Sequence, residues 1–194
     1  MPTSVAILRV IHILNAVLMA WPIYALVMVN QRLRLGPPLG DRVDIFMENT
    51  IKNRTIPCLI FQLTALVSGL ALILASNQSL SVIFSNTALA VKFGLLLVVM
   101  GLLTVVHFNL QPRIDSLFAS GQPPYAAEFA AEIGTLRLVR KRVASICMFL
   151  VLIIVMFGVQ AWVAFPIWLT GILVLMIGLF TWRVYSSETP YGWV

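Results

Sequence analysis

Residues 143–182 read VASICMFLVLIIVMFGVQAWVAFPIWLTGILVLMIGLFTW, a stretch without a single charged side chain. A helix needs about 20 mainly apolar residues to cross the hydrocarbon core of a bilayer, so this stretch is too long for one span. Pro166 lies among the aromatic residues Trp162, Phe165 and Trp168, a pattern that indicates a tight turn between two helices. We therefore predict two consecutive membrane spans, at about residues 143–163 and 166–184.

Three further apolar runs precede this stretch, at about residues 5–30, 56–75 and 83–110. The first contains Trp21-Pro22, is too long for the apolar region of a signal peptide and shows no small-residue cleavage site, so we expect the protein to retain it. Of the 194 residues, 60% are hydrophobic and only 10% are charged, against roughly 25% charged in soluble domains. The sequence predicts an all-α, polytopic membrane helix bundle with five transmembrane helices in one domain, residues 1–194.

The basic residues predict how this bundle is oriented. They gather in the connection between the first and second spans and in the polar segment 111–142, whereas the connections at 76–82 and 164–166 carry no charge. By the positive-inside rule, the N-terminus is then outside and segment 111–142 is a cytoplasmic polar loop, in which residues 125–138 look like a short surface helix. We therefore attribute the net charge of +6 to basic residues that flank membrane spans, and we expect no nucleic-acid partner. We expect a multi-pass protein of the cell membrane, of the bacterial inner-membrane type.

Three ionisable residues lie inside the predicted spans: His12, Lys92 and His107. Such residues are costly in a membrane and by default indicate a function. Counting ~1.5 Å per residue places His12 and Lys92 in the outer leaflet, very roughly 10–14 Å below the surface. His107 lies about 22 Å farther along the third span, so it and His12 are not expected to share one haem iron. Each histidine could still bind a group separately.

Lys92 has no acidic residue of this chain at its own depth. Its partner would then be a haem propionate, a substrate carboxylate, another subunit, or water reached by snorkelling. Asn15, one turn after His12, and Gln160 could join the same outer polar group, whereas His107 could simply lie in the membrane interface. We also predict that Gly94 and Gly101, seven residues apart, allow close helix packing.

Other chemistries have weaker sequence support. The only cysteines, Cys58 and Cys147, form no CxxC or Cys/His pattern, so we predict no zinc site and interpret both as small buried apolar residues. A copper-transport role requires clusters of methionine, histidine or cysteine, but the eight methionines are scattered and form no paired motif.

Several short motifs follow one another in a distinctive order along residues 5–160. They are Val10-Ile11-His12-Ile13-Leu14 followed by Trp21 and Tyr24, then Met47-Glu48, Lys52-Asn53-Arg54 with Pro57, Ser68-Gly69-Leu70, Lys92-Phe93 followed by His107, and Ser120-Gly121-Gln122. Their order and spacing resemble those of the HemJ-type protoporphyrinogen oxidase family and its CopD-like integral membrane relatives.

This resemblance implies a b-type haem, with His12 as the ligand of the haem iron, and adds His107 and Asn15 as candidates for binding the cofactor. It implies that Lys92 is the catalytic residue and faces a carboxylate of a porphyrin substrate. The reaction would be the oxidation of a porphyrinogen, with electrons passed to a membrane acceptor.

Two alternatives remain open. The family has a glycine after its tryptophan in the first span and an arginine soon after the following aromatic residue, whereas this chain has Pro22 and no arginine before Arg32. The protein could therefore be a non-catalytic CopD-like membrane subunit that packs in a larger complex or a homo-oligomer. The second alternative is a small-molecule or metal carrier.

Overall fold

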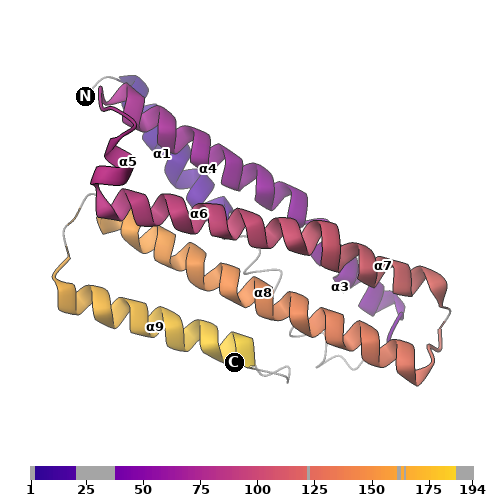
Figure 1. Ribbon diagram of the computed structural model, residues 1–194. Coiled ribbons are helices and arrows are strands. Elements are labelled where there is room, and N and C mark those ends of the chain that lie inside the picture. Colours follow the sequence, from indigo (N-terminus) through magenta and orange to yellow (C-terminus); the bar gives the residue numbers. More distant parts are fainter. Residues whose placement is uncertain (1–2, 21–37, 122, 161–162, 164, 187–194) are drawn as a thin grey trace.

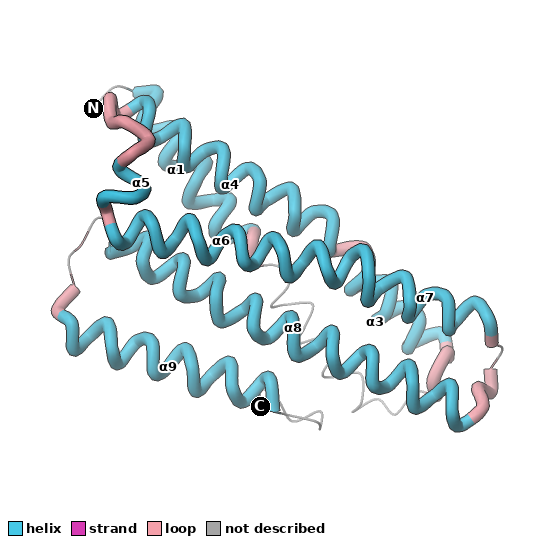
Figure 2. Tube along the Cα trace, viewed as in Figure 1, coloured by secondary structure: helices cyan, strands magenta, loops and turns pink. Residues whose placement is uncertain are grey.

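The computed structural model describes residues 3–20, 38–121, 123–160, 163 and 165–186, and in these residues it contains helices and no strand (Figures 1 and 2). In chain order the helices are α1 (Thr3–Leu18), α3 (Arg42–Lys52), α4 (Thr55–Ala75), α5 (Val82–Ser85), α6 (Thr87–Val105), the π-helical turn η1 (Val106–Leu110), α7 (Gln111–Ser120), α8 (Ala127–Gln160) and α9 (Ile167–Ser186).

Four helical stretches are long and apolar enough to cross a membrane, at 42–75, 87–120, 127–160 and 167–186. α1 is a shorter apolar helix, and residues 21–30 of the first predicted span, including Trp21-Pro22, lie outside the described residues. Large apolar side chains such as Ile7, Leu175 and Met176 are exposed on the outside of the bundle, where a soluble protein would present polar groups. The protein is therefore a polytopic membrane helix bundle, as the sequence predicts.

The helices pack in a layered order. α1 lies along α4, α6 lies along α8, and α9 lies against the other side of α8 (Figure 1). The central apolar contacts come from Met19 just after α1, Leu96 and Val99 of α6, and Val151 and Ile154 of α8. Because α6 and α8 run through the middle, they control the spacing between the α1–α4 pair and α9.

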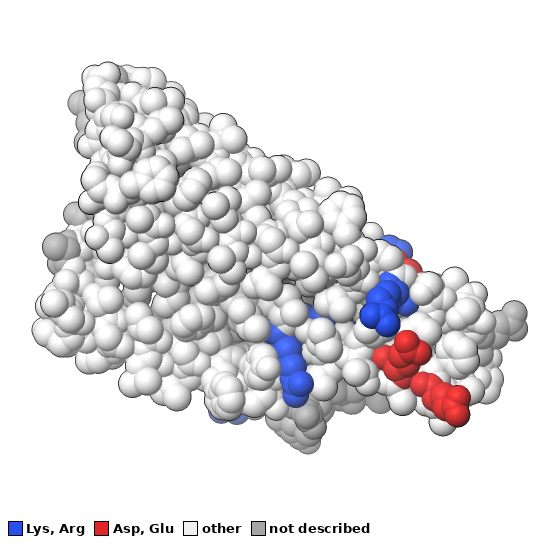
Figure 3. Space-filling model, in the orientation of Figure 1, with Lys and Arg blue, Asp and Glu red and all other residues white. Residues whose placement is uncertain are grey.

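At one end, the helices extend beyond the length that a bilayer needs. α8 has 34 residues, or about 51 Å at ~1.5 Å per residue, against a hydrocarbon core of ~30 Å. α3 precedes α4 and α7 continues α6 at the same end, and the charged side chains visible in Figure 3 lie toward it. Segment 111–142, expected as a polar loop, is therefore mostly helical. The surface helix expected over 125–138 is the first part of α8, which continues into the fourth span without a break.

The predicted turn at Pro166 separates the last two spans. The amides of Leu169 and Thr170 donate to the Pro166 carbonyl at 3.0 and 3.2 Å, which starts α9. The third span begins at Thr87, later than predicted, because the Asn86 side chain accepts a hydrogen bond from the Leu89 amide and caps α6. Residues 82–85 form the separate short helix α5.

The predicted close packing at Gly94 and Gly101 is wrong. Among the residues that the structure describes, no atom would lie within 4 Å of a Cβ atom added to either glycine. Close contacts instead occur at Gly69 of α4 and Gly158 of α8, where the neighbouring atoms belong to His12 and Lys92. Spacing along a helix indicates a shared face, but it does not indicate whether another helix covers that face.

We predict that Gly94→Ala and Gly101→Ala leave the thermal unfolding temperature in detergent unchanged or raise it. Alanine favours a helix by about 1 kcal/mol over glycine, and the added methyl group has room at both positions. Circular dichroism melts would check this. A drop of several degrees in either variant would show that a neighbour packs closely there.

Candidate functional site

His12 is held against α4 by one hydrogen bond and one close contact. Its Nδ1 lies 2.9 Å from Ser68 Oγ, and a Cβ atom at Gly69 would lie 3.2 Å from its Cε1. Any side chain larger than glycine at position 69 would thus push against the imidazole. Ser68 and Gly69 together fix the position of His12 in the half of the bundle away from its extended end.

The same contacts select one tautomer of His12. Ser68 Oγ also lies 3.2 Å from the backbone carbonyl of Ala65, to which it donates. A carbonyl can only accept, so both bonds form together when the serine proton points to Ala65 and His12 Nδ1–H donates to Ser68 Oγ. None of the described residues hydrogen-bonds to Nε2. Its lone pair is then available to a metal or a proton, which is the state a metal-binding histidine requires.

Lys92 of α6 lies close to this histidine. A Cβ atom at Gly158 would be 3.5 Å from Lys92 Nζ, so the ammonium group lies over the bare backbone of α8. It is also near enough to His12 for the lysine charge to act on the imidazole. Among the described residues, Lys92 has no salt bridge or hydrogen-bonded acceptor for its side chain. His12 therefore lies against Gly69 of α4 and Lys92 against Gly158 of α8, with the lysine charge near enough to influence the imidazole.

Of the two other polar residues expected near this pair, only Gln160 is placed elsewhere. Asn15 is buried three residues beyond His12 on α1. Gln160 does not join the group, since its Nε2 donates at 2.7 Å to Thr170 Oγ1 of α9. Gln160 instead ties the end of α8 to the start of α9.

His107 occupies a second, similar arrangement at the other end of α4. Its Nδ1 lies 2.9 Å from Thr55 Oγ1, which in turn donates at 3.0 Å to the Lys52 carbonyl. By the same reasoning, Nδ1–H donates and Nε2 keeps its lone pair. His107 lies in the π-helical turn η1, and such turns are frequent at functional sites.

The two histidines cannot bind one iron together. Their partners, Ser68 and Thr55, are thirteen residues apart on α4, which corresponds to about 20 Å along the helix axis. This agrees with the separation predicted from the spacing of Lys92 and His107.

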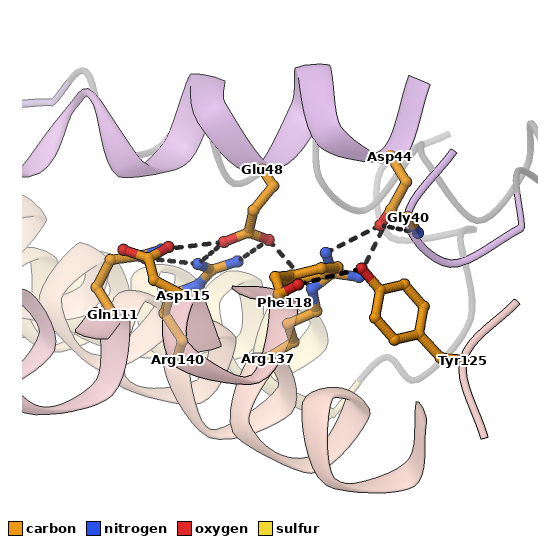
Figure 4. Close-up of polar contacts among 9 residues, drawn as sticks. All are labelled: Gly40, Asp44, Glu48, Gln111, Asp115, Phe118, Tyr125, Arg137 and Arg140. Atoms are coloured by element: carbon orange, nitrogen blue, oxygen red, sulfur yellow. Dashed lines mark hydrogen bonds and ion pairs between the residues drawn. The ribbon is translucent and has the colours of Figure 1, made fainter. Parts of the chain in front are cut away.

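A buried charge cluster joins the extended helix ends, and we define it as Asp44, Glu48, Gln111, Arg137 and Arg140 (Figure 4). Arg137 donates to both Asp44 oxygens at 3.2 and 3.0 Å and to Glu48 at 3.1 Å. Arg140 donates to both Glu48 oxygens and, at 2.7 Å, to Gln111 Oε1. The cluster therefore links α3, α7 and α8.

Flanking contacts surround the charge cluster. The Gly40 amide donates to Asp44 at 3.0 Å, and Gln111 also donates to Asp115, which forms a 2.8 Å salt bridge with Lys52. The Arg137 guanidinium lies over the Phe118 ring at 4.9 Å. Because the acids and guanidinium groups already bind one another, the charge cluster fixes the helices rather than offering a ligand site.

These contacts strongly change the pKa of Glu48. α3 carries four charged side chains, so the membrane-crossing part of this stretch is α4 and Glu48 lies outside it. Burial alone would raise the pKa of Glu48. The hydrogen bonds and charge of Arg140, the charge of Arg137 and the hydrogen bond from Gln111 outweigh burial and lower its pKa from 4.5 to about 2.

Sequence reasoning missed this cluster. It treated Arg137 and Arg140 only as markers of the cytoplasmic side, and noticed Glu48 only as part of a motif. A usable signal was present, because Asp44 and Glu48 are four residues apart and Arg137 and Arg140 are three apart, spacings that put each pair on one helix face.

Among the described residues, no group of three or more histidine, cysteine, aspartate or glutamate side chains could hold a metal ion. Comparisons of the chain with protein-family models, with curated proteins and with solved structures found no match. A functional assignment therefore depends on the geometry of the described residues.

We predict that Glu48→Gln destabilises the fold by about 3–5 kcal/mol at neutral pH, since it breaks a buried ion pair and leaves both arginines with one carboxylate between them. Unfolding in SDS or urea from mixed micelles would measure this. Glu132→Gln, an exposed acid of α8, is the matched control and should change stability by less than ~0.5 kcal/mol.

The pH dependence is a second test of the same ion pair. Because the pKa of Glu48 is lower in the folded state, its contribution of roughly 3 kcal/mol is present above pH 4.5 and is lost as the pH falls toward about 2. Glu48→Gln should remove this part of the pH dependence. An unchanged pH profile in the variant would contradict the assignment.

Proposed function

We propose that the protein is a haem-binding redox protein of the cell membrane, similar in activity to the HemJ-type protoporphyrinogen oxidases. The observation that carries this proposal is the hydrogen bond between His12 Nδ1 and Ser68, which leaves Nε2 available, in the half of the bundle away from its extended end, where Lys92 lies over Gly158. The expected orientation, with the N-terminus outside, would put this pair in the outer leaflet.

His12 has the features of a histidine that would bind a haem iron. A metal-ligating histidine nearly always donates its other ring N–H to a nearby acceptor, which fixes the tautomer and the ring orientation. Ser68 provides that acceptor, and its link to the Ala65 carbonyl anchors it to α4. His12 alone would hold the haem iron, and His107 would serve a separate site.

Lys92 has the features of a partner for a porphyrin carboxylate. An ammonium group inside a membrane is costly unless an opposite charge accompanies it. The acids among the described residues lie at 41, 44, 48, 115, 128 and 132, all toward the extended end of the bundle. A porphyrin combines a flat apolar ring with carboxylates, and would fit an apolar helix interface that presents one cation.

In this proposal, the chain supplies position and charge. Haem, when bound, supplies one-electron chemistry that side chains do not provide. His12 would hold the cofactor at a fixed depth, and Lys92 would orient a porphyrinogen by its carboxylate. The surrounding helices would exclude water, and electrons would pass to an acceptor in the membrane.

The first test of this proposal is a visible spectrum of the protein purified in detergent, oxidised and reduced. We expect a Soret band whose intensity is lost in His12→Ala and retained in His107→Ala. Ser68→Ala should weaken haem retention by about 10–100-fold, the usual effect of removing a partner of a metal ligand. Absence of a Soret band even after haem supplementation would refute the haem proposal.

The role of Lys92 needs a separate assay. Lys92→Met has a similar length but no charge, so we expect it to abolish porphyrinogen oxidation while helix content and haem content stay at wild-type levels. Lys92→Arg should keep part of the activity. Wild-type turnover in Lys92→Met would rule out the carboxylate role, and a haem-loaded wild-type protein with no turnover would favour the non-catalytic membrane subunit.

A further inference from the structure

The buried face of α4 carries polar side chains along its whole length. Thr55, Gln62 and Ser68 are all buried on this face, seven and six residues apart, spacings that keep them near one stripe of the helix. Thr55 and Ser68 each accept a hydrogen bond from a histidine, so the stripe runs from His107 at one end to His12 at the other. Polar groups inside a membrane are costly and by default indicate a function.

A cavity of about 90 Å³ joins the first two of these polar residues. Thr55 and Gln62 line it from α4, and apolar side chains such as Val99, Leu103 and Val151 form its walls. His12 and Lys92 are not among the described residues that line it, so the cavity is separate from the site proposed for haem.

The side chain of Gln62 needs a hydrogen-bond donor in this cavity. Gln62 is 2% exposed, and its Oε1 accepts no hydrogen bond from any residue that the structure describes. A buried oxygen without a donor is destabilising, and a water provides the donor where the space beside the oxygen is large enough. Gln62 therefore indicates that the cavity holds water.

The length of the cavity fits a single file of waters. Thr55 and Gln62 are seven residues apart, which corresponds to about 10.5 Å along α4. The cavity volume of about 90 Å³ holds about three waters at ~30 Å³ each. Three waters between two side chains form four hydrogen bonds of about 2.8 Å, or ~11 Å in all. The file therefore reaches from one polar side chain to the other.

Both ends of this file accept hydrogen bonds. Thr55 Oγ1 donates to the Lys52 carbonyl and accepts from His107, which leaves one oxygen lone pair for a water. Gln62 ends the file with its carbonyl oxygen. A file that donates at both ends must contain one member that donates in both directions, and a hydronium ion has the protons to do so. The two acceptors therefore favour an excess proton over a hydroxide ion.

Asn15 continues the polar line from Gln62 to His12. The His12–Ser68 contact aligns the antiparallel helices α1 and α4, so Asn15, three residues after His12, lies level with about residue 65. This level is between Gln62 and Ser68, about 4.5 Å from each along the axis. The Asn15 side chain is buried, and an amide can both donate and accept. Asn15 therefore carries the line past Ala65, the apolar residue of the stripe.

The basic residues at the extended end of the cavity are already bound by other groups. Arg137 and Arg140 are paired with the acids of the charge cluster, and Arg54 and Lys141 have interactions of their own. A proton that moves from water to water there passes bound cations rather than isolated ones.

We propose that this stripe and its cavity form a proton path between His12 and the extended end of the bundle. A proton moves from the half-buried His107 through the waters between Thr55 and Gln62, and then by way of Asn15 to His12. Each water accepts one proton and releases another, so O–H and N–H bonds alone are made and broken and the file keeps its composition. The path requires neither haem nor porphyrin, and it would serve any reaction at His12 that takes up or releases protons.

The test is hydrogen exchange in the protein reconstituted in lipid bilayers and observed by solid-state NMR. The chain has two histidines, so 15N-histidine labelling gives two imidazoles, which His12→Gln assigns. We expect the Gln62 side chain to receive magnetisation from water. Gln62→Leu should slow deuterium exchange at His12 Nδ1 by about 10-fold or more, the factor expected for the loss of one hydrogen bond. Asn15→Leu should slow the exchange similarly.

Two matched variants lie away from the path. Gln160→Leu removes an amide that donates to Thr170, and Thr64→Val removes a hydroxyl that donates to its own helix at Ile60. Both should exchange at His12 at the wild-type rate, and circular dichroism checks the fold of every variant.

Unchanged exchange at His12 in a folded Gln62→Leu variant would overturn the proton path. A Gln62 side chain that receives no magnetisation from water would also overturn it, and this measurement on the wild type needs no variant. Neither result depends on haem, so a Soret band that is lost in His12→Ala would leave the haem proposal standing while the path fails.

Discussion

The contact between Glu48 and the guanidinium groups of Arg137 and Arg140 is the constraint on which the rest of the structure depends. These residues are about 90 positions apart in the sequence, and the contact sets where α3–α4 lies along α8. Removing three charges from water is costly, and the cost is recovered only if each oxygen and each N–H finds a partner. Gln111 and Asp44 provide those partners, so a small displacement of any one helix would leave a buried charge unpaired.

With that register fixed, α4 presents a series of polar positions to its neighbours. Thr55 and Ser68 each accept from a histidine Nδ1, and each donates to the backbone carbonyl three residues earlier. A hydroxyl that bonds its own helix costs little in a membrane, because it has a local partner before any neighbour arrives. α4 can therefore orient two histidines on different helices without any charged residue in its apolar part.

Much of the fold follows from the sequence, because the length of an apolar run and the position of a proline are local properties. The run at 143–182 is too long for one span, Pro166 divides it, and α8 and α9 lie on either side of that turn. The depths predicted for His12 and Lys92 likewise need only the helix rise, which is nearly constant. These predictions need no knowledge of which helix neighbours which.

The remaining features depend on neighbours and could not be predicted in this way. α3, α7 and the first half of α8 are polar enough to resemble loops, and they are helical because their charges bind one another across the bundle. Gly94 and Gly101 share a helix face as predicted, but no described residue packs closely on that face. Close contacts occur instead at Gly69, with His12, and at Gly158, with Lys92. Cys58 and Cys147 looked like isolated apolar residues until α4 and α8 placed them around one cavity.

Along its axis the bundle therefore carries three kinds of polar layer. The layer farthest from the extended end holds a histidine and a lysine, the middle layer holds the sulfur of two cysteines, and the extended end holds the charge cluster. The order follows the cost of burial: sulfur is nearly apolar and can lie deepest without a partner, one imidazole needs one hydroxyl, and a cluster of full charges requires many partners at once. The stretch α3–α4 and helix α8 contribute to every layer, so a change in their register would alter all three layers together.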